Sequence, residues 1–167
     1  MCLRNAVPVK ITEPMKVYKV FMLAVDPEGN EHIRSPYFTN YVWAPGMNCS
    51  GPIDTHSTDI HKELTDRYNK GLGKIALNGG AFHSFANKSD AERLVRALEK
   101  DGTAYLIALA NILICTGASK ADYVVGECTV PQNCEYVFEG TFEILPYDEP
   151  AKSVASKKLI LNRILKK

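Results

Sequence analysis

The stretch NGGAFHSFANKSDAERLV, residues 78–95, joins a glycine pair, a short aromatic segment and the start of a helix. Phe82 and Phe85 enclose His83 in a run that favours an extended strand. Ser89 and Glu92 follow as an S-x-x-E capping box, which predicts a helix N-terminus. A strand, a turn and a helix in this order often present one polar side chain to a cleft, and here that side chain is His83. The buried stripe of the helix is predicted to consist of Ala91, Leu94, Val95 and Leu98, with the helix ending at Gly102.

Strands are predicted on both sides of this stretch. Residues 15–25 are apolar at nearly every position, which is typical of a central strand covered on both faces. Residues 123–130 form a second strand that Pro131 ends. A third is predicted at residues 158–165, where the leucines share one parity. Residues 135–138 and 141–145 are interpreted as a hairpin around Glu139-Gly140.

The remaining segments include one further helix and one run that stays undecided. Ser57 or Thr58 can cap a helix that Gly71 ends. Residues 105–115 fit a buried strand or a short buried helix equally well, because periodicity does not separate the two.

Together, these elements predict an α+β fold, in which two helices are inserted into a mostly antiparallel sheet. Residues 1–14 are interpreted as an N-terminal arm and residues 15–167 as one domain.

The composition and net charge of the chain limit the classes of protein to which it can belong. The chain has 167 residues, 46% of them hydrophobic, and a formal net charge of +1. A net charge this small provides no global field for nucleic acid or an anionic membrane. Residues 152–167 contain six basic residues and no acidic one, which predicts a solvated basic face, with contact to an acidic partner or a phosphate backbone as the alternative. With no signal peptide or long apolar span recognised, we expect a soluble protein in a cytosol-like compartment.

The stretch that includes His83 supplies the first candidate site. In a cleft, His83 would serve as a hydrogen-bonding or acid–base group whose pKa can lie near neutrality. Packed between aromatic side chains, it would instead bond a main-chain carbonyl. Gly79 and Gly80 either let the backbone approach a ligand, with Phe82 beside it, or make the turn into the strand.

Other polar residues are expected to be structural. Glu127 lies within an apolar strand, so it either faces water or needs a partner, for which Arg34 and Lys19 are the candidates. His56 and His61 are five residues apart, which is not one helical face, so no metal site is predicted there. Five cysteines at irregular spacings contain no C-x-x-C pair, so a structural zinc site is not expected.

Several short motifs are similar to small domains that occur in phages and large DNA viruses. The resemblance spans residues 16–165 and implies a viral or phage accessory domain, without naming a reaction. Its motifs are Tyr18-Lys19-Val20, the segment 80–85, the Val-x-Glu-x-x-Val strand of residues 125–130, and the Ala-Lys-type strand of residues 155–160.

A second, more distant resemblance is to ADP-ribosyltransferases of the poly-ADP-ribose polymerase type. Residues 80–95 resemble that family's strand and Ser-x-Ser-Ala helix, and residues 135–138 resemble its late strand with the catalytic glutamate. The resemblance implies NAD as cofactor, Glu135 as the residue that polarises a ribose hydroxyl, and Phe82 or His83 stacked on nicotinamide. The first strand departs from the family because it lacks His-Gly-Thr.

The sequence therefore supports two functional hypotheses. The leading one is a non-enzymatic accessory domain that binds a protein partner or itself, with a viral particle as one setting and no cofactor. The alternative is a nucleotide-handling enzyme that uses NAD, with His83 and Glu135 as catalytic residues and Gly79, Gly80 and Phe82 as ligand-binding residues.

Overall fold

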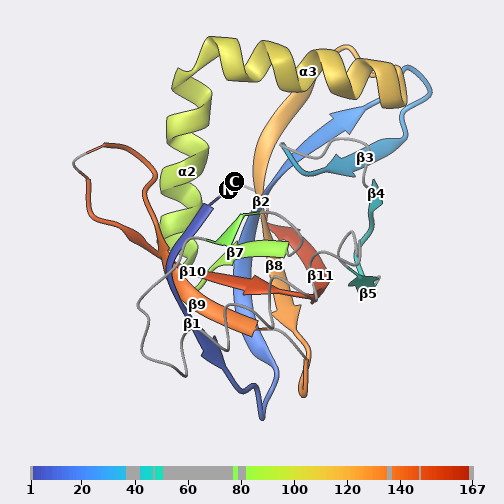
Figure 1. Ribbon diagram of the computed structural model, residues 1–167. Coiled ribbons are helices and arrows are strands. Elements are labelled where there is room, and N and C mark those ends of the chain that lie inside the picture. Colours follow the sequence, from blue (N-terminus) through green and yellow to red (C-terminus); the bar gives the residue numbers. More distant parts are fainter. Residues whose placement is uncertain are drawn as a thin grey trace.

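In the part of the chain that the structure describes, a long antiparallel sheet carries two helices on one side, and this confirms the predicted α+β class (Figure 1). The computed structural model describes residues 2–36, 42–46, 48–50, 77–78, 82–134, 137–146 and 148–165. Its strands are β1 (Cys2–Val9), β2 (Met15–Val25), β3 (Glu31–Arg34), β4 (Val42–Trp43), β5 (Asn48–Ser50), β6 (Leu77–Asn78), β7 (Phe82–Phe85), β8 (Ala121–Val130), β9 (Val137–Phe142), β10 (Ala151–Ser156) and β11 (Lys158–Leu165). Its helices are α2 (Lys88–Lys100) and α3 (Gly102–Thr116).

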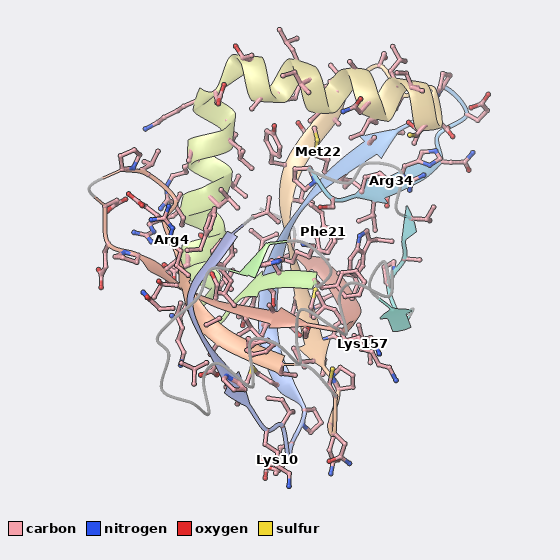
Figure 2. The ribbon with its side chains drawn as sticks, viewed as in Figure 1. Arg4, Lys10, Phe21, Met22, Arg34 and Lys157 are labelled. Atoms are coloured by element: carbon pink, nitrogen blue, oxygen red, sulfur yellow. The ribbon has the colours of Figure 1, made fainter. Side chains whose placement is uncertain are left out.

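Strand β2 holds the centre of the sheet, as its apolar sequence predicts. The strand order is β5-β11-β8-β2-β7-β10-β9-β1-β6, while β3 pairs with β2 and β4 off this path. β2 and β8 are paired from Met15–Val130 to Ala24–Ala121. Alternate side chains of β2 point to opposite faces, so Met22 lies toward the helices and Phe21 toward the other side (Figure 2).

Among the described residues, two large cores lie on the two faces of the sheet, and Leu3, Ala6, Phe138 and Ala155 form a third, smaller one. One core lies between the sheet and the helices and includes Met22, Phe85 and the predicted stripe of α2. The other lies on the opposite face, is enclosed largely by strands, and contains Phe21, Trp43 and Phe82. Figure 1 shows α2 and α3 arranged as an L around the upper halves of β2 and β8.

The helices begin and end at positions that differ from the prediction. α2 starts at Lys88 with Asn87 at the N-cap position, so Ser89 lies inside the helix and the predicted capping box is wrong. Asp101 follows α2 directly, and its Oδ1 accepts a hydrogen bond of 3.1 Å from the Ala104 amide. Asp101 therefore caps α3, and Gly102 begins a helix rather than ending one.

The undecided run at residues 105–115 belongs to helix α3. It ends at Gly117, whose φ of 74° provides the left-handed conformation of a helix stop, and the Gly117 amide donates to the Leu113 carbonyl at 2.9 Å. The helix predicted from Ser57 or Thr58 to Gly71 lies outside the described residues.

Strand β9 corrects the predicted hairpin at residues 135–145. It continues through Glu139 and Gly140, and pairs with β10 on one side and β1 on the other. A Cβ atom added to Gly140 would lie 2.4 Å from the Arg4 main-chain oxygen, so glycine permits a close approach of two strands here and makes no turn.

Strands β1 and β10 are among those that the sequence did not predict. β10 lies between β9 and β7, where it completes the sheet beside His83. Residues 2–9, interpreted as part of an arm, form β1, which pairs with β9 and β6. Asn5 adopts a positive φ of 56° where the register of β1 against β9 shifts, between Arg4 and Val7.

Candidate functional site

His83 lies in the short strand β7, opposite Ala155 of β10. Only 7% of the residue is exposed, and neither ring nitrogen has a hydrogen-bond partner among the residues that the structure describes. Burial, followed by the positive charge of Lys19, lowers the pKa of the imidazole from 6.5 to about 3. The ring is therefore neutral at pH 7 and does not change its charge near neutrality.

Lys19 of β2 places a positive charge beside this strand. Its Nζ atom donates a hydrogen bond of 3.0 Å to the main-chain oxygen of His83 and lies 6.0 Å from the centre of the Phe21 ring. Burial lowers the pKa of this amine from 10.5 to about 8, and the thiol of Cys128 acts in the opposite direction. The amine thus links β2 to β7 at a considerable desolvation cost.

Phe82 belongs to an aromatic cluster on the opposite face of β7 from His83. Its ring packs edge-on against Trp43 with centroids 5.1 Å apart, and Trp43 contacts Phe21 in the same way at 5.1 Å. All three side chains are buried. The structure therefore separates Phe82 and His83, which the sequence grouped together, onto two faces of one strand.

The other sequence-predicted site residues do not join them in the described part of the chain. Gly79, Gly80 and Glu135 lie outside the described residues, as do His56 and His61. Within the residues that are described, no group of three or more His, Cys, Asp or Glu side chains is placed to hold a metal ion. Glu127 pairs with Arg163 of β11 at 3.3 Å, so the expected partners Arg34 and Lys19 were wrong.

A groove runs between α2 and the sheet. Its volume is about 250 Å³, its floor is apolar and its rim carries charges of both signs from α2. Tyr123 in the floor is buried, and its ring lies 6.1 Å from that of Tyr105. The lining consists of Lys88, Glu92, Val95, Arg96, Glu99, Tyr123, Val124, Val125 and Leu165.

The most unusual surface of the described residues is the outer side of helix α3, which we call the α3 face. It is defined by Leu106, Ile107, Ala110, Leu113 and Ile114. The four large side chains are 64%, 60%, 50% and 83% exposed, and Ala110 is exposed between them. Figure 2 shows side chains of α3 that point away from the sheet. Exposed apolar groups gathered in this way mark an interaction surface.

The inner side of α3 explains why the helix is stable in this position. Ala108 and Ile112 are buried against the sheet, and Tyr105 donates a hydrogen bond of 3.2 Å to the Ala121 carbonyl. The outer side, in contrast, is exposed although it also carries large aliphatic side chains. Sequence reasoning missed this surface, and the signal was the absence of any charged residue or histidine from residue 102 to residue 119.

No helix in the described part of the chain is long and apolar enough to cross a membrane. Comparison of the chain with protein-family models, with curated proteins and with solved structures found no match.

Proposed function

We propose that this chain is a non-enzymatic accessory domain that associates with other protein chains through the α3 face. The single observation that carries the proposal is the exposure of four large aliphatic side chains on one uncharged helix. Covering one such side chain removes about 1.5–3 kcal/mol of unfavourable hydration, so covering four provides a substantial driving force. The resemblance to phage and large-DNA-virus domains supports a viral particle as one setting.

The properties of His83 also favour a non-enzymatic role. A general acid or base works best with a pKa near the working pH, and the pKa of His83 is about 3. Its burial and its position opposite Ala155 suit a side chain that packs the sheet. The proposal therefore predicts no saturable thermal shift with NAD or ADP-ribose. A saturable shift that His83→Ala abolishes would favour the nucleotide-handling alternative.

The test compares carboxylates placed on the α3 face with a carboxylate placed elsewhere on the exposed surface. Ile107→Glu combined with Ile114→Glu places carboxylates on the α3 face, whereas Leu145→Glu places one on another exposed apolar residue. Size-exclusion chromatography with light scattering should detect an assembly, alone or with proteins of the native source, that the α3 variant loses and Leu145→Glu keeps. A wild-type chain that is monomeric and binds nothing from that source would overturn the proposal. Circular dichroism verifies that each variant is folded.

A further inference from the structure

The α3 face has a pattern that is symmetric about Ala110. Leu106 and Ile107 precede Ala110 by four and three residues, and Leu113 and Ile114 follow it by three and four. These spacings place all five residues on one side of an α-helix. A large pair, a small residue and a second large pair therefore follow one another along the exposed side.

Such a pattern is complementary to itself when two helices run in opposite directions. A two-fold axis through Ala110 places Leu106 of one copy beside Ile114 of the other, and Ile107 beside Leu113. Ala110 then meets its own equivalent, where the small side chain lets the helices approach closely. An interface between two identical chains requires this correspondence, because the same patch must supply both halves.

Charge favours the same arrangement. Residues 102–119 contain no Asp, Glu, Lys, Arg or His, so two copies meet without repulsion between like charges. Asn111 is exposed beside the α3 face and supplies an amide that can donate and accept hydrogen bonds. A partner recognised by charge would need countercharges, and α3 offers none.

We propose that a second copy of this chain covers the α3 face, in an antiparallel two-fold helix pair centred on Ala110. This inference rests on the proposed function and names its partner. One helix from each chain provides less contact than the roughly 1,600 Å² of a standard interface. The dimer is therefore expected to dissociate on dilution.

Disulfide trapping tests the geometry. Cys115 is an exposed free thiol on α3, so Cys115→Ser serves as the background for the full-length chain. Ala110→Cys places a thiol on the axis, and mild oxidation should give a covalent dimer linked at residue 110 in tryptic mass spectrometry. Thr103→Cys is the matched control on the same helix. It lies seven residues from the axis, so in the antiparallel pair its two copies are about 21 Å apart and should not link.

A charge pair tests the same contact without cysteine. Leu106→Glu and Ile114→Lys should each shift the dimer midpoint to at least tenfold higher concentration. An equimolar mixture of the two variants should recover association, because the introduced carboxylate of one chain faces the introduced amine of the other. Linking at residue 103 rather than 110, or a mixture as weak as the single variants, would overturn the antiparallel pair.

The outcomes separate this inference from the proposed function. A purified chain that stays monomeric at high concentration, yet forms a complex with another protein that Ile107→Glu/Ile114→Glu abolishes, overturns the self-pairing and leaves the function standing. A chain that stays monomeric and forms no complex through the α3 face overturns both the self-pairing and the proposed function. Sedimentation of the monomer with phosphatidylcholine vesicles, lost in the same variant, would assign the α3 face to a lipid surface and also overturn both.

Discussion

The Nζ atom of Lys19 lies 3.0 Å from the main-chain oxygen of His83 and donates a hydrogen bond to it. The bond joins β2 to β7 where the register between these strands consists of the single pair Tyr18–Phe85. It brings an amine into the side of the sheet that is otherwise filled by Phe21, Trp43 and Phe82. A strand contact with few main-chain bonds is thus reinforced by a charge whose burial is costly.

Stability should depend on the ionisation of Lys19. Its pKa is about 8 in the folded chain and 10.5 in the unfolded chain, so between these values the unfolded chain binds more protons. The free energy of unfolding should rise with pH in this window, by about 2 kcal/mol between pH 8 and 10, with the burial cost fully present below pH 8. Urea denaturation at several pH values measures this. Lys19→Met should lack the increment, and an identical pH dependence in both proteins would refute the assignment.

His83 should make the fold sensitive to acid. The unfolded imidazole takes up a proton near pH 6.5, whereas the folded one does so only near pH 3. Stability is therefore lost as the pH falls below 6.5, by about 2 kcal/mol between pH 7 and 5. His83→Phe should remove this component in thermal or urea unfolding. His32→Gln is the control, because His32 is bound to Asp26 at 2.8 Å and should leave the His83 component in place.

The aromatic cluster provides a spectroscopic test of the core. Trp43 is the only tryptophan of the chain and contacts Phe82 and Phe21. Phe82→Ala should cost about 3–5 kcal/mol and change the native fluorescence of Trp43. Phe85→Ala, in the other core, should cost a similar amount with a smaller effect on that emission. Equal spectral changes in both variants would contradict the separation of the two cores.

Gly140 should tolerate no side chain. A Cβ atom there would meet the Arg4 main-chain oxygen at 2.4 Å, and main chain cannot move aside cheaply. Gly140→Ala should lower the free energy of unfolding by about 1–3 kcal/mol and loosen β1, which hydrogen exchange of β1 amides would detect. Gly102→Ala is the matched control, because no atom lies within 4 Å of its added Cβ. A Gly140→Ala protein as stable as the control would disprove the close approach.

The sequence predicts the elements whose own pattern contains the necessary information. β2 and β8 follow from their apolar runs, β11 follows from the shared parity of its leucines, and the buried stripe of α2 follows from helical spacing. α3 could not be assigned because it is apolar on every side, so its period carries no signal. The role of Gly140 depends on Arg4, more than 130 residues away, and local sequence therefore suggested a turn.

The candidate site was harder to predict because it, too, depends on contacts between residues that are distant in the sequence. His83 was recognised as a residue of interest, but its burial comes from β10, a strand that the sequence did not reveal. Phe82 was recognised as well, and its partner Trp43 lies about 40 residues earlier in a two-residue strand. The exposure of the α3 face depends on which side of the helix meets the sheet, and a uniformly apolar helix does not specify that side.

The pairing of β2 with β8 also has a consequence for synthesis of the chain. The paired residues are separated by about one hundred positions, so β2 leaves the ribosome long before β8 exists. Contacts this distant in sequence slow folding and leave apolar strand edges exposed in the meantime. Until β8 has been synthesised, β2 of one nascent chain must not pair with strands of other nascent chains. Translation speed and chaperone supply should therefore affect the yield of correctly folded protein.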